Sequence, residues 1–334
     1  MMKILIATPT GRIGRRIVPE LLAPEFSVRV LARDPARLPE DIRQQVEVVR
    51  GSTDDAATLR RALDGMDAML WCVPSESCQE TDVGLHYERF AVAARLAIRK
   101  ARTPRVVTIS AGGKGLARRA GPISALHAME EILNKSGAAI RHLRCGFFME
   151  NFLSQARSIS ERGSICYPMP VAVAIPMAAV TDIADVALRW LVRRDWQGIE
   201  GVAVHGAESL SFVQAAAVME QILERPVQYR EVSANHYVRT LVEGGASAEY
   251  ARSQAEMFSK LGQGILGAEQ RTAESTTPTT LAAWTETVLL PSIEWLRSQE
   301  TAAAPAPNLN PALHQIRNCV CGRTNYEYET QRIP

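Results

Sequence analysis

The sequence predicts a doubly wound α/β fold built on a parallel sheet. Short apolar runs recur along the first half of the chain, and stretches with a helical spacing of apolar residues lie between them. Strands that alternate with helices in this way pair in parallel through right-handed crossovers, because helices must cover both sheet faces. The expected strands are ILIA at 4–7, SVRVLAR at 27–33, VEVVRGS at 46–52, AMLWCVP at 68–74, RVVTISAG at 105–112 and AIRHLRCGFF at 139–148.

The helical stretches fit between these strands. After the first strand, Ile13, Ile17, Leu21 and Leu22 fall on one stripe of a helix. The later helices are expected in DAATLRRALDGM at 55–66, LHYERFAVAARLAIRKA at 85–101 and ALHAMEEILNKSG at 125–137. This alternation of strand and helix extends to about residue 150.

Beyond residue 150 the pattern predicts a smaller, mostly helical C-terminal lobe. A helix is expected at 179–192 with Asp182 near its start, where the helix end favours an acid, and a second helix begins at Ser211. Trp190 and Trp196 are expected to pack between the lobes. The predicted division is 1–155 for the sheet domain, with 179–200 packing back on it, and 156–298 for the second lobe. The Ala/Pro-rich TAAAPAPNLNP at 301–311 predicts a flexible tail over 299–334.

Composition narrows the class of protein. At 334 residues with 46% hydrophobic side chains, the chain can build a large core, and its net charge of +2 gives no reason to expect nucleic acid as a partner. Six cysteines are too few for a disulfide framework in a chain of this size. With neither a signal sequence nor a membrane span, we expect a cytoplasmic protein, with a homodimer as an open alternative. The single Cys-x-Cys at 319–321 has no second pair, so no metal site is predicted.

The loop TPTGRIG at 8–14 favours binding of a dinucleotide. Gly11 and Gly14 keep the spacing of a G-x-x-G-x-x-G phosphate loop, with Thr8 in place of the first glycine. Gly11 would let the backbone approach a pyrophosphate, and Gly14 would let the helix pack closely on the strand. A plain strand-to-helix connection is the alternative. The position of the loop, directly after the first strand, favours the dinucleotide and therefore a Rossmann fold.

Arg33 indicates a preference for NADP(H). It ends the second strand, where Rossmann proteins selective for NAD place an acid that accepts the ribose 2′-hydroxyl. A cation suits a 2′-phosphate instead, and Arg12 could hold the same phosphate from the other side. Both arginines could also be solvated surface residues. Asp34 keeps NAD(H) possible, because it could accept the 2′-hydroxyl.

Several blocks of the chain together resemble the NmrA-like family of atypical short-chain dehydrogenase/reductases. The blocks are TPTGRIG, LARDPARL, EEILNKSGAAIRHLRCGFFMENF at 130–152, VTDIADVA at 180–187, HGAESLSFVQAA at 205–216 and PTTLAAW at 278–284, and the likeness covers about residues 3–290. The family has an NAD(P)-binding Rossmann fold with a small C-terminal lobe. It includes NADPH-dependent reductases and redox-sensing regulators that bind the cofactor without turning it over. Thr8 departs from the family's usual glycine.

The resemblance implies a set of cofactor contacts. The loop Thr8–Gly14 would hold the pyrophosphate, and Arg12 and Arg33 would contact the adenosine phosphate. The remaining cofactor contacts that we expect are Thr10 and Ile13 in the loop, Val73 and Pro74 at the adenine or ribose, and Ser110, Cys145, Gly146 and Phe147 beside the nicotinamide.

The catalytic residues are less clear, because the Tyr-x-x-x-Lys pair of the wider superfamily is absent. Leu126 and Glu130 stand near those two positions. His127 is the nearest proton donor, and Ser110 could donate a hydrogen bond to a substrate carbonyl. A structural role is the alternative for His127, and Lys114 is expected to be a flexible surface residue. A further set of residues has two possible roles: they could form the apolar wall of a pocket for an aromatic or quinone-like substrate, or they could simply pack in the core. These residues are Tyr87, Phe147, Phe148, Met149, Phe152 and Tyr167.

Two functions remain open. The first is an NAD(P)H-dependent oxidoreductase that reduces a small carbonyl, enone, quinone or imine compound. The second is a non-catalytic NADP(H)-sensing regulator that binds a protein partner. The missing Tyr-x-x-x-Lys pair favours the regulator. The aromatic stretch near residue 147 and the lack of a recognisable partner-binding segment favour the enzyme, which is our prediction.

Overall fold

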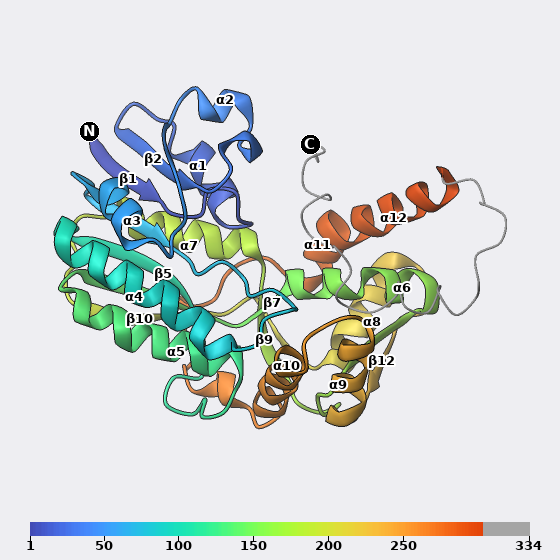
Figure 1. The fold of residues 1–334 in the computed structure, drawn as a ribbon. Coiled ribbons are helices and arrows are strands. Elements are labelled where there is room, and N and C mark those ends of the chain that lie inside the picture. The colour runs from blue at the N-terminus through green and yellow to red at the C-terminus, as the bar shows by residue number, and fades with distance from the viewer. Residues whose placement is uncertain (303–334) are drawn as a thin grey trace.

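A computed structural model describes residues 1–302 of the chain, and over these residues a seven-stranded parallel sheet forms the centre of the fold (Figure 1). The strand order is β10-β6-β5-β4-β1-β2-β3. The strands are β1 Met2–Ile6, β2 Phe26–Ala32, β3 Glu47–Arg50, β4 Ala68–Trp71, β5 Arg105–Ala111, β6 Ala139–Cys145 and β10 Ile199–Val204. This is the predicted doubly wound Rossmann architecture, which is confirmed.

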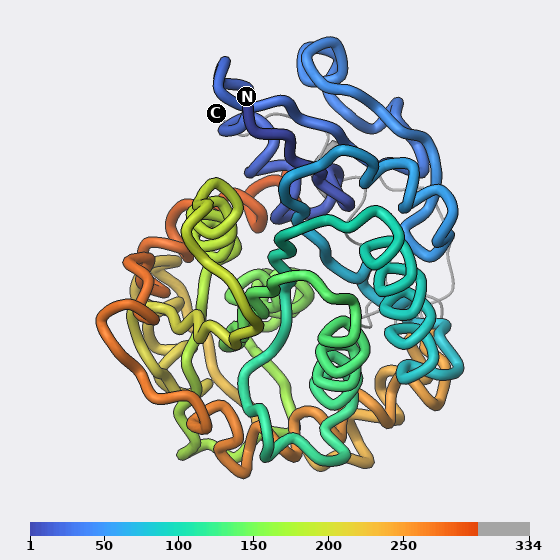
Figure 2. Tube along the Cα trace, turned by 90° about the vertical axis from the view of Figure 1, so that its left-hand side faces the viewer, coloured from blue at the N-terminus to red at the C-terminus, as the bar shows by residue number. Residues whose placement is uncertain are grey.

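Helices cover both faces of the sheet, as Figure 2 shows for α4 and α5 on one side and α7 on the other. These helices and their neighbours are α1 Gly14–Glu20, α2 Glu40–Arg43, α3 Ala56–Leu63, α4 Val83–Ala101, α5 Pro122–Leu133 and α7 Val180–Val192. Successive residues of a strand point to opposite faces of the sheet. Leu70 packs on the side of α1 and α7, whereas Met69 packs on the side of α3, α4 and α5. Burial on both faces explains why these strands read as apolar runs rather than as alternating patterns.

Side-chain caps set where several helices begin. Asp55 precedes α3 and accepts from the Ala57 N–H at 3.0 Å, and Asp82 precedes α4 and accepts from the Leu85 N–H at 2.8 Å. Ser211 forms a reciprocal capping box with Gln214 at the start of α8, as the sequence predicted. These caps satisfy backbone N–H groups that a helix start leaves without a partner.

The second lobe contains strands that the sequence pattern did not reveal. It holds a three-stranded sheet of order β11-β9-β7 and a β12-β8 pair. Its elements are β7 Phe147–Phe148, η3 Met149–Gln155, α6 Ala156–Arg162, β8 Ser164–Tyr167, β9 Ile175–Ala178, β11 Ser209–Leu210, α8 Phe212–Leu223, β12 Gln228–Glu231, α9 Ala234–Glu243, α10 Ala248–Leu261, η4 Ile265–Gly267, α11 Leu281–Trp284, the π-helical turn η5 Thr285–Leu289 and α12 Leu290–Ala302. The expected long strand over 139–148 therefore ends at Cys145, and its last two residues pair with β9.

The second lobe has an aromatic core of its own. Tyr167 stacks on Phe258 with ring centroids 4.6 Å apart, and Phe152 packs edge-to-face on Phe212 at 5.7 Å. Trp284 and Phe147 join the same cluster. Of the aromatic residues that could have lined a substrate pocket, Phe147, Phe152 and Tyr167 are thus buried against one another.

The expectation that Trp190 and Trp196 pack between the lobes is wrong. Their rings meet edge-to-face at 5.8 Å beside the sheet, and Trp196 belongs to the core under α7. The guanidinium of Arg141, near the start of β6, lies 4.8 Å from the Trp190 ring and 4.5 Å from the Trp196 ring. This arrangement holds α7 to the sheet edge through packing and cation–π contacts.

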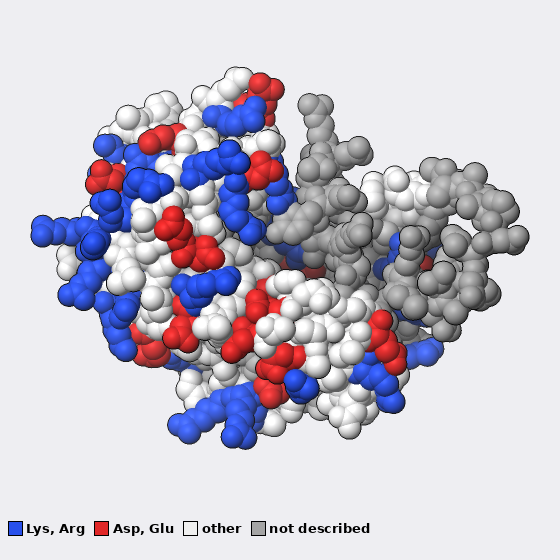
Figure 3. Space-filling model, viewed as in Figure 1, with Lys and Arg blue, Asp and Glu red and all other residues white. Residues whose placement is uncertain are grey.

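The predicted tail begins too early, because α12 continues regularly to Ala302. The rest of the predicted tail, including the Cys-x-Cys at 319–321, lies outside the described residues. Within residues 1–302, no helix is both long and apolar enough to cross a membrane. On the face drawn in Figure 3, basic and acidic side chains are interspersed, in keeping with the small net charge.

Candidate functional site

The phosphate-loop candidate lies at the point where the sheet changes its winding direction. β1 pairs with β2 on one side and with β4 on the other, so the chain runs outward in opposite directions from this pair. The loop that follows β1 therefore opens at the carboxyl edge between the two halves of the sheet. Ligands of doubly wound sheets bind at this crevice.

Gly14 is required by the close path of this loop. A Cβ atom at Gly14 would lie 2.1 Å from the Thr8 carbonyl oxygen, whereas one at Gly11 would lie at an ordinary 3.4 Å from the same atom. The Gly11 N–H donates to the Thr8 carbonyl at 3.2 Å and closes the turn. Thr10 is half-buried and Ile13 packs in the core beneath the loop. Thr8 thus makes the turn without a glycine.

The two arginines that are candidates for phosphate binding lie in different surroundings. Arg33 follows β2, is exposed, and makes no ion pair within residues 1–302. Arg12 is half-buried, and its charge is close enough to act on Glu150 of η3. Asp34 caps a short 3₁₀ turn, η1 Pro35–Arg37, by accepting from the Ala36 N–H at 3.2 Å, which engages one of its two carboxylate oxygens.

Glu150 is a buried carboxyl that the sequence analysis did not single out. It accepts from the Val180 N–H at the start of α7, at 3.0 and 3.1 Å, and from Trp284 Nε1 at 3.1 Å. Burial raises its pKa, while these donors and the Arg12 charge act in the opposite direction. Glu150 therefore joins η3, α7 and α11 next to the loop that holds Arg12.

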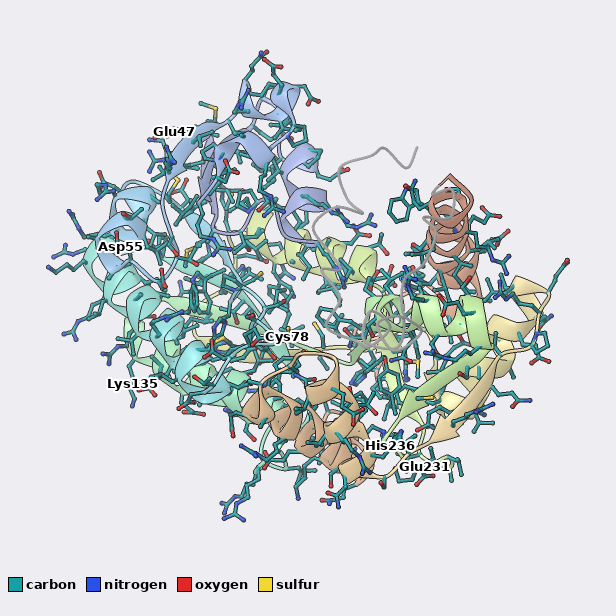
Figure 4. All side chains as sticks on the ribbon, turned by 45° about the vertical axis from the view of Figure 1, so that its right-hand side comes forward. Glu47, Asp55, Cys78, Lys135, Glu231 and His236 are labelled. Carbon is teal, nitrogen blue, oxygen red and sulfur yellow. The ribbon has the colours of Figure 1, made fainter. Side chains whose placement is uncertain are left out.

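The loop after β4 links the candidate cofactor site to the second lobe. Val73 and Pro74 are half-buried, and the Pro74 carbonyl lies 2.8 Å from His86 Nε2 of α4. Further along, the Ser247 N–H donates to the Cys78 carbonyl at 2.8 Å. Figure 4 shows Cys78 where this loop meets the helices of the second lobe. The loop that would line the adenine or ribose is thus fixed to α10 through its N-cap residue Ser247.

Ser110 belongs to a buried polar cluster at the carboxyl end of β5. Its Oγ donates to Glu130 Oε1 of α5 at 2.6 Å, and neither residue is more than 2% exposed. Arg144 of β6, opposite Ser110 in the strand register, donates from Nε to Oε1 at 3.2 Å and from Nη2 to Oε2 at 2.8 Å. Burial favours the neutral acid, but the hydrogen bonds from Arg144 and Ser110 outweigh it and lower the pKa of Glu130 to about 2. Glu130 is therefore ionised.

Lys114 and Glu269 extend this cluster toward the second lobe. Lys114 Nζ lies 2.7 Å from Glu131 Oε1 and 3.4 Å from Glu130 Oε2, so Lys114 is held by carboxylates rather than free on the surface as expected. Glu269, after α10, accepts from the Gly113 N–H at 2.7 Å and lies 3.9 Å from Arg144. The cluster thus bridges the β5–α5 loop and the chain segment after α10.

His127 is largely buried and already hydrogen-bonded. Its Nε2 lies 2.9 Å from the Ala111 carbonyl oxygen, so Nε2 must carry the proton and Nδ1 is left as the acceptor. Burial lowers the pKa of His127 despite the nearby Glu130 carboxylate. The imidazole is therefore neutral near pH 7. Its role as a proton donor stays a prediction.

The residues after β6 lie where the two lobes join. A Cβ at Gly146 would be 2.5 Å from the Pro176 carbonyl oxygen of β9, so this position admits no side chain without movement. Cys145 is buried, and burial raises the pKa of its thiol. It is therefore a thiol rather than a reactive thiolate. Phe147 packs 5.4 Å from both Phe152 and Phe212, so its ring faces the core of the second lobe.

A hollow of about 250 Å³ lies beside this junction. Its lining comes from the start of β9 and the residue before it, from His205 after β10, from β11 and from the segment after α10: Ala174, Ile175, Pro176, His205, Ser209, Gly264, Leu266, Gly267, Glu269, Gln270 and Arg271. Glu269 connects the hollow to the Arg144 cluster. Within residues 1–302, no group of three or more His, Cys, Asp or Glu is placed to hold a metal ion.

Sequence reasoning missed the roles of Glu130, Arg144 and Glu150. One signal was available, because the strand AIRHLRC places Arg141, His142 and Arg144 in an otherwise apolar run. Charged residues are rarely buried without a partner. The partner of Arg144, however, is 14 residues away on a helix, and no local pattern identifies it.

Known proteins resemble both parts of this chain. Residues 9–160 match the NAD(P)H-binding family. The chain is 29% identical over 310 residues to a (4-alkanoyl-5-oxo-2,5-dihydrofuran-3-yl)methyl phosphate reductase of Streptomyces griseus, covering 90% of this chain and 99% of the relative. It is 26% identical over 259 residues to an NAD(P)H azoreductase of Xenophilus azovorans, covering 76% of this chain and 86% of the relative.

The fold is shared with a solved structure, the NADPH-dependent quinone oxidoreductase of Escherichia coli in complex with NADPH. The TM-score is 0.71 at 22% identity, covering 88% of this chain and 99% of the other. The predicted fold is therefore confirmed, and the match of residues 9–160 to the NAD(P)H-binding family confirms the predicted cofactor class. Residues 9–160 match an NAD(P)H-binding family, and the described chain has the Rossmann fold expected from its resemblance to the NmrA-like, atypical short-chain dehydrogenase/reductases.

Proposed function

We propose that the protein is an NAD(P)H-dependent reductase of a small carbonyl, enone, quinone or imine compound. The observation that carries this proposal is the likeness, over nearly its whole length, to a reductase whose name contains an unsaturated lactone bearing an alkanoyl group. The azoreductase and the quinone oxidoreductase support the same reaction type, since each is named for a small electron-poor acceptor.

The residues at the carboxyl edge of the sheet suit a dinucleotide. The loop suits a diphosphate against its backbone, because Gly11 is exposed and carries no side chain. Gly14 serves a different purpose, since its lack of a side chain lets the start of α1 pack against the Thr8 carbonyl. Bound NAD(P)H supplies the hydride. The part of the protein is to hold that cofactor between β1 and β4, to hold the acceptor under the second lobe, and to exclude water from both.

NADPH is the preferred cofactor in this proposal. Arg33 is exposed at the end of β2, where it can reach a 2′-phosphate, and one oxygen of Asp34 is already engaged by the Ala36 N–H. A guanidinium forms charge-assisted bonds with phosphate that a ribose hydroxyl cannot match. Arg12, whose charge also acts on Glu150, is the second candidate contact for the same phosphate.

Proton delivery has two candidate routes. His127 lies next to the buried cluster of Ser110, but its Nε2 proton is used by the Ala111 carbonyl. Delivery from solvent is the alternative, and it needs no tyrosine. Replacement of His127 by alanine separates the two, since unchanged turnover across pH 6 to 8 removes His127 as the donor.

Steady-state oxidation of NADPH tests the proposal. Purified protein is mixed with NADPH and a panel of quinones, enones, ketones, imines and azo compounds, and absorbance at the nicotinamide band is followed. Turnover with at least one class is the expected result. Tight binding of NADPH with no turnover and no hydride exchange on any class contradicts the reductase and supports the cofactor-sensing regulator instead.

A further inference from the structure

The hydroxyl of Ser110 has only one proton, and the structure shows where it is used. The 2.6 Å bond from Ser110 Oγ ends on a carboxylate oxygen of Glu130, and both side chains are shielded from solvent. An ionised carboxylate accepts hydrogen bonds and donates none. Ser110 must therefore be the donor in this pair.

Two features keep Glu130 in the charged, accepting form. Arg144 donates to both carboxylate oxygens, and Lys114 Nζ lies 3.4 Å from Oε2. Gly201 of β10 leaves room for the Arg144 guanidinium, since any side chain there would collide with it. The bond from Ser110 is therefore charge-assisted and fixed in direction.

Ser110 also stands on the nicotinamide half of the predicted site. Dinucleotides span the switch point of the sheet, with one mononucleotide over each half. Arg33 follows β2 and assigns the adenosine phosphate to the β1–β3 half, so the nicotinamide belongs over β4, β5 and β6. Ser110 is the penultimate residue of β5, at that edge.

From this geometry we propose that Ser110 meets its ligand as a hydrogen-bond acceptor, with Glu130 and Arg144 as positioning residues that fix its proton. The inference rests on the proposed function and reverses the donor role first expected for Ser110. The group that Ser110 accepts from must carry an N–H or O–H. Two sources have that chemistry: the carboxamide NH₂ of the nicotinamide, and an N–H or O–H on the substrate.

A carbonyl oxygen of the substrate does not fit this site. To donate to it, Ser110 would have to give up a charge-assisted bond to a buried carboxylate in exchange for a neutral one, which is weaker. The bare carboxylate would then lose one of its donors without access to water. The acceptor role leaves the whole cluster satisfied.

The experiment removes the acceptor and the donor separately. Binding of NADPH and of its acetylpyridine analogue, in which a methyl group replaces the carboxamide NH₂, is measured by calorimetry for the wild type and for Ser110→Ala. Thr108→Val is the matched control, because Thr108 lies on the same strand and face, two residues before Ser110, and bonds to His142 instead. Thermal unfolding shows whether each variant is folded.

If the cofactor carboxamide is the donor, Ser110→Ala weakens NADPH roughly tenfold and leaves the analogue unchanged, while Thr108→Val does not discriminate between them. If the substrate is the donor, both cofactors bind Ser110→Ala normally. The variant then raises KM for a hydroxynaphthoquinone but not for its methyl ether. Ser110→Cys, which keeps the size but accepts weakly, gives the same pattern should the alanine variant unfold.

Two results overturn the acceptor role. One is a Ser110→Ala variant that equals the wild type on both cofactors and both quinones. The other is a loss of kcat on the methyl ether as large as on the hydroxyquinone, which indicates donation to the carbonyl. Failure of the proposed function looks different, because then the wild type itself turns over none of the acceptors, whether or not it binds NADPH.

Discussion

The guanidinium carbon of Arg144 occupies space that a side chain at Gly201 would need, since a Cβ there would lie 2.3 Å from it. Gly201 and Arg144 lie on the neighbouring strands β10 and β6. The glycine therefore allows Arg144 to reach across the strand and donate to Glu130. A residue of an edge strand thus supports the polar cluster around Ser110.

Gly201→Ala tests this relationship without removing any charged group. We expect the methyl group to displace the guanidinium from Glu130 and to lower the free energy of unfolding by about 1–3 kcal/mol, as for other overpacked sites. Urea unfolding at pH 7 measures the change. The matched control is Gly84→Ala in α4, where the nearest atom to a Cβ is at an ordinary 3.4 Å. Equal stability of the two variants contradicts the assignment.

The phosphate loop offers a contrast between two glycines. Gly14→Ala forces the loop away from the Thr8 carbonyl, so we expect a loss of folding stability of about 1–3 kcal/mol and a loss of NADPH binding. Gly11→Ala has room in the backbone, so stability stays within about 0.5 kcal/mol while cofactor binding falls, because the methyl group occupies the path of the diphosphate. Thermal unfolding and calorimetry separate the two effects. Normal NADPH binding by Gly11→Ala removes this loop as the diphosphate site.

The strands of the central sheet could be predicted because each has a local sequence pattern. Each core strand is an apolar run such as Ala68–Trp71, buried on both faces, and each lies next to a helix with a clear apolar stripe. The connection rules for parallel strands then fix the order of layers. The turn at Gly14 could be predicted for a similar reason, because the seven residues TPTGRIG contain the whole phosphate-loop pattern.

The second lobe was not predictable at the same level. Its strands are two to four residues long, β9 contains Pro176, and β12 is the polar sequence QYRE. Each pairs with a strand remote in the chain, as β12 does with β8. Propensity carries little information for such short segments, and tertiary context decides them.

The polar cluster around Ser110 could be predicted only in part from the sequence. Ser110 could be placed at the carboxyl end of a strand from the sequence, and Glu130 could be placed on the following helix. Their contact with Arg144 depends on the parallel register of β5 and β6 and on the position of α5 over them. The function of Ser110 as donor or acceptor depends on that contact, so it could not be read from the residue type.

Arg33→Ala tests the preference for NADPH. We expect NADPH binding to weaken by about 1.5–3 kcal/mol, the value of a hydrogen bond to a charged group, with little change for NADH. Calorimetry with both nucleotides measures the difference. Arg60→Ala is the matched control, because Arg60 is an exposed arginine in the last turn of α3, which leads to the amino end of β4. An equal loss for both nucleotides would show that Arg33 does not select the phosphate.

The buried position of His142 leads us to expect that the free energy of unfolding depends on pH. It is 1% exposed, and its ring lies 2.7 Å from Thr108 Oγ1 through Nδ1 and 2.9 Å from Asn134 Oδ1 through Nε2. Burial lowers its pKa to about 4, and Arg144 and Lys114 add to this against the opposing charges of Glu130 and Glu131. In the unfolded chain the ordinary value of 6.5 applies. Between these two values the unfolded state binds more protons, so the folded state loses stability as pH falls from 6.5 towards 4.

A pKa lowered from 6.5 to about 4 corresponds to roughly 3.5 kcal/mol in total, at about 1.4 kcal/mol per pKa unit, and about 2 kcal/mol of this is lost between pH 7 and pH 5. His142→Gln removes the titrating group, so its free energy of unfolding in urea should lose this part of the pH dependence, although the variant is less stable at pH 7. His236→Gln, at an exposed histidine of α9 labelled in Figure 4, is the control and should keep the wild-type slope. A His142→Gln variant that loses as much stability as the wild type between pH 7 and pH 5 would place the responsible proton elsewhere.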